Sequence, residues 1–262
     1  MNDAGDRTRE QHLTLVVPVY KEQQRLDKTL DKVQAFIDAA PKGTVDAVFV
    51  DDGSPDESAA LIHGLINARS DPRISLLRYP VNQGKGFAVK TGVMEAVGDL
   101  ILMSDADLST PLEDWRRLYA AIQSGADIAC GSRAVPGAHV GKPPPLHRRF
   151  LSRVFNLLVR LAGVRGIRDT QCGFKLFKGD VAKRVFGQLH VRRFAFDVEM
   201  IALARDMGYR VVEVPVSWDY SGHSTVRLFS SGCHMLFDLL RLVLRRAFGD
   251  KHGVRERARK QE

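Results

Sequence analysis

The first half of the chain alternates short apolar runs with segments of helical periodicity, and this alternation restricts the fold more than any other feature. The apolar runs cover residues 13–17, 45–50, 74–77 and 100–103. The helical segments that follow them cover residues 26–37, 58–66, 87–97 and 112–122. Runs that are continuously apolar are typical of strands buried on both faces. The pattern therefore predicts an α/β fold with a central, mostly parallel sheet flanked by helices.

Acidic and polar residues cluster directly after three of these runs, where the ligands of parallel sheets bind. The clusters are P-V-Y-K-E at 18–22, D-D-G-S at 51–54 and D-A-D at 105–107. Two carboxylates one residue apart at a strand end suit Mg²⁺ or Mn²⁺ holding a diphosphate. Each cluster alone is also ordinary turn or helix-capping chemistry. Their shared position at strand ends favours a nucleotide and metal site.

The loop N-Q-G-K-G at 82–86 places Lys85 between two glycines at the start of an expected helix. Backbone N–H groups and an ammonium can meet an anion at such a position. The G-x-x-x-x-G-K-[ST] spacing is absent, which excludes a P-loop, and no G-x-G-x-x-G follows the first strand. The second absence counts against a dinucleotide-dependent dehydrogenase.

Composition narrows the class of protein further. The chain has 262 residues, of which 44% are hydrophobic and 27% charged, so we expect a globular protein of one large or two small domains. Cys130, Cys172 and Cys233 lie far apart without metal-ligand spacing, which predicts neither a disulfide framework nor a structural zinc site. No apolar stretch approaches the roughly 18 residues of a membrane span. We therefore expect a cytoplasmic chain that does not cross a membrane by itself.

Two basic amphipathic segments follow a proline-rich loop in the second half, one at 146–161 and one at 235–248. Each could pack its apolar side on the core, or dock on an anionic membrane surface. The first is the better docking candidate. We expect a flexible tail over 1–12, a catalytic domain over 13–228, an amphipathic helix over 229–249 and a disordered basic tail over 250–262.

The order of these motifs resembles the inverting family 2 glycosyltransferases with the GT-A fold. After D-A-D comes G-S-R at 131–133, and D-T-Q-C-G-F-K-L-F at 169–177 is a far more specific motif. With F-D-V-E at 196–199 and V-P-V-S-W at 214–218, it looks like the dolichyl-phosphate β-glucosyltransferase subgroup, which is close to the dolichol-phosphate mannose synthases. The resemblance covers about residues 13–248 in the expected order.

The resemblance implies roles for individual residues. Those matching the donor nucleotide-sugar site are Pro18, Tyr20, Glu22, Val50, Asp52, Lys85, Asp105, Ala106 and Asp107. Asp105 and Asp107 would also bind the Mg²⁺ or Mn²⁺, and the catalytic candidates are Asp107, Arg133 and Asp169. Candidates for the acceptor site are Arg133, Arg148, Arg149, Gln171, Asp197 and Glu199.

One position departs from the family pattern. Relatives carry G-x-S-K near the end, where the lysine reaches the donor diphosphate, whereas this chain has Thr225 in that place. Arg227 or His223 is the candidate to replace it.

The reaction that the resemblance implies is inverting transfer of a hexose, glucose from UDP-glucose, to a polyprenyl phosphate. Such an enzyme would be peripheral on the cytoplasmic face of a membrane, held by anionic lipid or by a membrane-protein partner. A phosphate nucleophile is already anionic and needs positioning more than a general base. Two alternatives stay open: transfer to a carbohydrate hydroxyl, for which Asp169 would be the base, and nucleic-acid binding. The net charge of +8 suggests the latter, but no recognisable nucleic-acid-binding motif supports it, so we expect no nucleic-acid partner.

Overall fold

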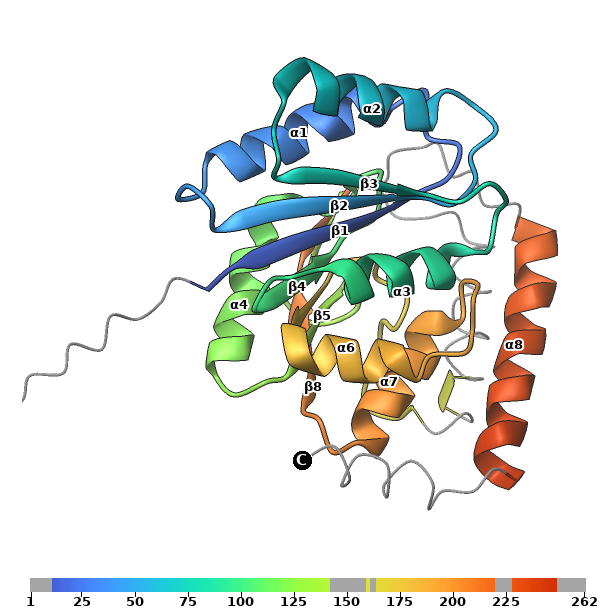
Figure 1. The fold of residues 1–262 in the computed structure, drawn as a ribbon. Coiled ribbons are helices and arrows are strands. Elements are labelled where there is room, and N and C mark those ends of the chain that lie inside the picture. Colours follow the sequence, from blue (N-terminus) through green and yellow to red (C-terminus); the bar gives the residue numbers. More distant parts are fainter. Residues whose placement is uncertain (1–10, 142–158, 161–163, 220–227, 249–262) are drawn as a thin grey trace, which may run out of the picture.

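The protein is described here by a computed structural model, which covers residues 11–141, 159–160, 164–219 and 228–248. Its centre is a seven-stranded sheet with the order β3-β2-β1-β4-β7-β5-β8 (Figure 1). The strands are β1 (Leu13–Val19), β2 (Val45–Asp51), β3 (Ile74–Arg78), β4 (Leu100–Met103), β5 (Ile128–Ser132), β7 (Lys175–Lys178) and β8 (Val211–Pro215). Strand β7 pairs antiparallel with β4 and β5, and the other pairs are parallel. The mostly parallel α/β sheet that the sequence predicts is confirmed.

Helices cover both faces of this sheet (Figure 1). They are α1 (Leu26–Asp38), α2 (Ser58–Arg69), α3 (Lys85–Glu95), α4 (Trp115–Gln123), α6 (Gly179–Gly187), α7 (Phe196–Asp206) and α8 (Leu228–Phe248), with a 3-10 turn, η1, at Leu112–Asp114. A separate two-stranded ladder joins β6 (His139–Val140) to β9 (Ser217–Trp218). Because successive side chains of a strand alternate in direction, Leu15 and Val17 of β1 pack under α1, α2 and α4, whereas Val16 packs with α3, α6 and α7.

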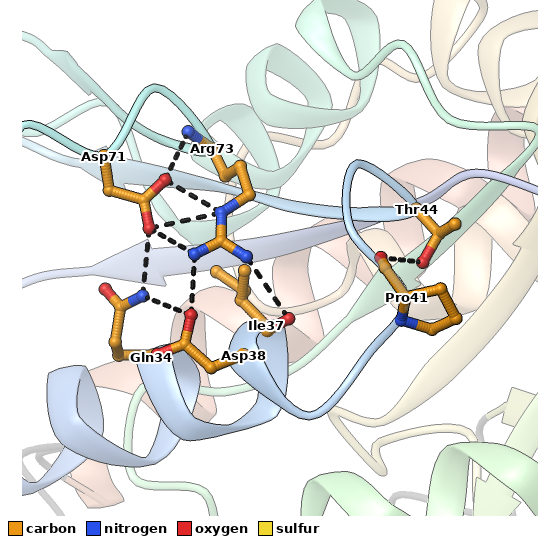
Figure 2. A network of polar contacts seen from close by, with 7 residues as sticks. All are labelled: Gln34, Ile37, Asp38, Pro41, Thr44, Asp71 and Arg73. Carbon is orange, nitrogen blue, oxygen red and sulfur yellow. Dashed lines mark hydrogen bonds and ion pairs between the residues drawn. The ribbon is translucent and has the colours of Figure 1, made fainter.

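A network of charged side chains fastens the end of α1 to the loop before β3 (Figure 2). The guanidinium of Arg73 donates hydrogen bonds of 2.6 Å to Asp38 and to Asp71, and Gln34 donates to the same two carboxylates at 3.1 and 3.0 Å. The hydrogen bonds from Arg73 lower the pKa of both Asp71 and Asp38. Helix α1, whose first residues lie beside the site described below, is thereby held at its far end.

Helix α8 packs against the rest of the protein through a narrow stripe of apolar side chains. Leu239 and Leu242 are buried in the core of the α3, α6 and α7 face. Within the described ranges, no helix has both the length and the apolar character needed to cross a bilayer. The tails expected at 1–12 and 250–262 fall largely outside the described residues.

Candidate active site

The carboxyl ends of β1, β2 and β4 meet at one edge of the sheet, because β1 pairs parallel with both neighbours. Pro18 of β1 and Val50 of β2 are partners in this register. The P-V-Y-K-E, D-D-G-S and D-A-D motifs therefore lie at the carboxyl ends of three adjacent strands, and the first two begin within their strands. A cavity of about 550 Å³ opens beside the first two motifs, lined by Lys21, Glu22, Gln23, Gln24, Arg25, Pro55 and Asp56.

Asp52 shapes the loop that carries the candidate lysine. Its carboxylate accepts hydrogen bonds from the backbone N–H groups of Gln83 (2.7 Å) and Gly84 (2.8 Å) and from the side-chain amide of Asn82 (2.8 Å). Burial raises the pKa of Asp52 despite the two backbone hydrogen bonds, which lower it. Gly84 has φ +104°, and a Cβ there would lie 2.5 Å from the carbonyl oxygen of Arg192, so only glycine suits this turn. Contact of Asp52 with a nucleotide stays a prediction.

Lys85, the first residue of α3, reaches the D-A-D motif. Its ammonium lies 2.5 Å from Oδ1 of Asp105. Burial would raise the pKa of the Asp105 carboxyl, but Lys85, and to a smaller degree Lys175 and Arg133, hold it below its usual value. Sequence position alone gives no sign that these two candidates pair.

The D-A-D motif is anchored from α1. The hydroxyl of Thr29 donates a 2.6 Å hydrogen bond to the carbonyl of Ala106, a contact that the sequence analysis missed. Asp107 accepts the N–H of Ser109 at 3.0 Å on one oxygen, and no described residue donates a hydrogen bond to its other oxygen. The described residues include no cluster of three or more metal-binding side chains. Carboxylate oxygens are ligands that Mg²⁺ and Mn²⁺ prefer, and binding of a cation by Asp105 and Asp107 stays a prediction.

Arg25, which the sequence analysis did not single out, belongs to this acidic cluster. Its guanidinium pairs with Glu22, with Nη2 2.7 Å from Oε1. Burial would lower the pKa of Arg25, but Glu22, Asp107 and Asp105 together raise it. Glu22 is thus bound to a neighbour, and Arg25 brings a permanent positive charge near D-A-D. The only sequence signal for Arg25 is its position just after P-V-Y-K-E.

Arg133 and Asp169, both expected to be catalytic, form a tight pair. Asp169 accepts hydrogen bonds from the backbone N–H (3.0 Å), Nε (2.7 Å) and Nη2 (2.9 Å) of Arg133. The guanidinium also lies over the ring of Trp218, 5.3 Å from its centroid, and Glu213 of β8 accepts the N–H of Asp169 at 2.9 Å. Burial would raise the pKa of Asp169, but the contact with Arg133 lowers it below its usual value.

The remaining acceptor candidates do not all face the site. Gln171 donates a long hydrogen bond of 3.5 Å to the carbonyl of Phe194. Asp197 and Glu199 are each only 3% exposed, and both carboxylates have internal partners. Asp197 pairs with Lys175 at 2.6 Å, and Glu199 accepts the N–H groups of residues 190 and 191. The direct acceptor contact expected of Asp197 and Glu199 disagrees with this structure, in which both side chains are buried and bound to internal partners.

The segment 169–175 contacts both the D-A-D motif, through Gly173, and Arg133, through Asp169. Strand β7 lies between β4 and β5 and runs opposite to them, so its first residue, Lys175, aligns with Met103 and Cys130. The residues just before it pass over the same sheet edge as D-A-D. Gly173 touches Asp105 so closely that a Cβ on it would lie 2.1 Å from Oδ2. Arg148, Arg149, His223 and Arg227 lie outside the described residues, so their roles stay predictions.

Comparison with known proteins identifies the family that the motifs resemble. The model for Glycosyl transferase family 2 matches residues 14–186. A dolichyl-phosphate beta-glucosyltransferase of Trichomonas vaginalis is 38% identical over 245 residues, covering 90% of this chain and 72% of the relative. The enzyme of that name from Homo sapiens is 34% identical over 247 residues, covering 89% of this chain and 75% of the relative.

Solved structures match at the level of the fold. A Mycobacterium tuberculosis glucosyl-3-phosphoglycerate synthase, in complex with Mn²⁺ and UDP-glucose, gives a TM-score of 0.65 at 14% identity over 89% of this chain and 79% of that one. A mannosyl-3-phosphoglycerate synthase from Rubrobacter xylanophilus gives 0.63 at 18% identity over 91% and 74%. Motif order, fold and relatives together show that the chain belongs to glycosyltransferase family 2, in the branch that contains the dolichyl-phosphate beta-glucosyltransferases.

Proposed function

We propose that the protein transfers glucose from UDP-glucose to a polyprenyl phosphate and inverts the anomeric carbon, giving a β-linked lipid product. Relatives named dolichyl-phosphate beta-glucosyltransferase, at 38 and 34% identity, support the glucosyl group and the acceptor class. The UDP-glucose donor follows from the family resemblance. The fold neighbour bound to UDP-glucose is consistent with it.

The observation that carries the choice of acceptor is the pair of Arg133 with Asp169. A sugar hydroxyl would need a base to remove its proton. Asp169 is a weak base, because two nitrogens of Arg133 donate to its carboxylate and its pKa is lowered. A lipid phosphate is already anionic and needs a cation to hold it. Arg133 uses Nε and Nη2 for Asp169, and no described residue accepts a hydrogen bond from its Nη1, which would bind a phosphate oxygen.

The donor side would hold a nucleoside diphosphate with Mg²⁺ or Mn²⁺. Asp105 and Asp107 would bind the cation, and the cation would stabilise the charge of the departing diphosphate. Lys85 and Arg25 lie beside these carboxylates and would add positive charge where the leaving group develops its own negative charge. Among the acceptor candidates, Gln171 remains a proposal for direct contact.

Helix α8 supports a location at a membrane surface, and the cytoplasmic face of that membrane is part of our proposal from the family resemblance. Away from its buried stripe it exposes Leu236 (43%), Phe237 (65%), Leu240 (50%) and Leu244 (55%). Arg241 and Arg245 are exposed on the same helix. Exposed apolar residues flanked by arginines suit an anionic lipid surface, where each basic side chain contributes about 1 kcal/mol. The segment 146–161, our first docking candidate, lies almost entirely outside the described residues.

The test is to identify the product. The protein is incubated with a panel of nucleotide sugars, Mn²⁺ and either a polyprenyl phosphate or a sugar acceptor, and the anomeric configuration of the product is determined. We expect a β-linked glucosyl lipid from UDP-glucose only. Arg133→Met should abolish transfer while UDP still binds, and Arg184→Met, at an exposed position of α6, is the matched control. Transfer to a sugar hydroxyl but not to the lipid would refute the proposal.

A further inference from the structure

A lysine lies fully buried at the start of β7. Lys175 is 0% exposed, and its ammonium donates a 2.6 Å hydrogen bond to Asp197 and another to the carbonyl of Cys172. Burying a charged group is costly even when it is paired. An apolar side chain would fill the same place in the sheet without this desolvation cost, so packing alone does not explain why a lysine is found there.

The carbonyl oxygen of Cys172, to which Lys175 donates, lies in a segment that contacts both Asp105 and Arg133. The next residue, Gly173, touches the carboxylate of Asp105. Three residues before Cys172, the carboxylate of Asp169 orients Arg133. A shift of this short segment would therefore displace the metal-binding carboxylate and the acceptor arginine together.

The surrounding charges keep the ammonium in place. Burial would lower the pKa of Lys175, but Asp197, with smaller contributions from Cys130 and Cys172, raises it to about 12. Lys85 and Asp105 form a second ion pair near enough that each pair influences the pKa values of the other. Burial raises the pKa of Asp197, although Lys175 and Lys85 act to lower it, so the two lysines and two carboxylates form one group of interacting charges.

We propose that Lys175 is a positioning residue for glycosyl transfer, which sets the backbone of Cys172 and Gly173 against Asp105 and keeps Asp169 under Arg133. Asp197 is its counter-ion and acts through it, without touching the acceptor. This inference rests on the transferase function proposed above.

The test separates positioning from simple stabilisation. Lys175→Met leaves Asp197 buried without a counter-ion and should lower the thermal midpoint. Lys175→Met combined with Asp197→Leu removes both charges, and replacing a buried ion pair with apolar residues is commonly neutral or stabilising. We expect the double variant to regain the thermal midpoint of the wild type. Its kcat should nevertheless stay about 10- to 100-fold lower, as for a misplaced catalytic group, with more Mn²⁺ needed for half-maximal rate.

Recovery of kcat together with the thermal midpoint would overturn the inference, because the pair would then serve stability alone. Asp197→Asn gives a second reading if the double variant fails to fold. It keeps an oxygen to accept from Lys175 but leaves the buried ammonium without its counter-ion, so kcat should fall while the KM for polyprenyl phosphate stays close to wild type. A large rise in that KM would contradict the inference. Wild type is assayed alongside: failure of wild type to transfer refutes the proposed function, whereas full activity of wild type and double variant refutes only the role of Lys175.

Discussion

Gly173→Ala is the most direct test of the contact between the D-T-Q-C-G segment and Asp105 of the proposed metal site. The backbone of Gly173 is not in the left-handed region, so alanine can adopt it without strain. Its new Cβ would lie 2.1 Å from Oδ2 of Asp105, whereas ordinary contact begins at 3.4 Å. The carboxylate must therefore retreat by about 1.3 Å, the difference between these two distances.

The expected cost falls on catalysis more than on stability. The group that must move is the end of a side chain that can rotate, so the loss of stability should stay at or below the 1–3 kcal/mol usual for overpacking, at about 1 kcal/mol. A shift of about 1 Å in a group that positions the reaction can slow it about 100-fold, which corresponds to about 2.7 kcal/mol in the barrier. We expect kcat to fall by about that factor.

The assay follows lipid product at increasing Mn²⁺, with thermal unfolding measured on the same preparations. Gly187→Ala is the matched control, because a Cβ on this last residue of α6 meets nothing within 4 Å. The control should keep its activity. Wild-type kcat and wild-type Mn²⁺ response in Gly173→Ala would refute the reasoning, as would an equal loss of activity in the control.

Four further predictions follow from the same structure. Asp107→Ala should leave the fold intact and lower turnover at least about 100-fold; near-normal activity of this variant in EDTA would contradict the metal assignment. Asp169→Asn should slow transfer to a lipid phosphate without reshaping its pH profile near neutrality, since no proton leaves the acceptor, and a reshaped profile would instead support a hydroxyl acceptor. Arg73→Met should destabilise the protein at neutral pH. Arg73 lowers the pKa of Asp71 in the folded protein, so the stabilisation from this pair is fully present above the unfolded pKa of about 3.9 and is lost as the pH falls through the folded pKa. The free energies of unfolding of variant and wild type, measured with urea, should therefore converge as the solution is acidified. A difference between them that does not change with pH would count against the network. Phe237→Ser should weaken sedimentation with phosphatidylserine vesicles but leave UDP affinity unchanged; equal sedimentation of variant and wild type would move docking away from α8.

The sequence alone was enough for the first four strands of the sheet, β1 to β4, and for the sheet edge at which the candidate site lies. Residues 13–17 and 100–103 are apolar at every position but one, Thr14, because helices cover them from both sides, and such runs mark strands of a parallel sheet. The same rule places D-A-D at a strand end. The family resemblance added roles for Arg133 and Asp169, though not the fact that they pair.

What the sequence did not reveal are the contacts between residues far apart in the chain. Nothing in D-T-Q-C-G-F-K-L-F indicates that its last residues form β7, the antiparallel strand between β4 and β5. That insertion brings Gly173 onto Asp105, and it buries Lys175 with Asp197 from α7. A carboxylate expected to meet the acceptor becomes instead the counter-ion of a buried lysine. Local periodicity reports which faces of an element are buried, but only the packing of the whole chain decides which charges meet there.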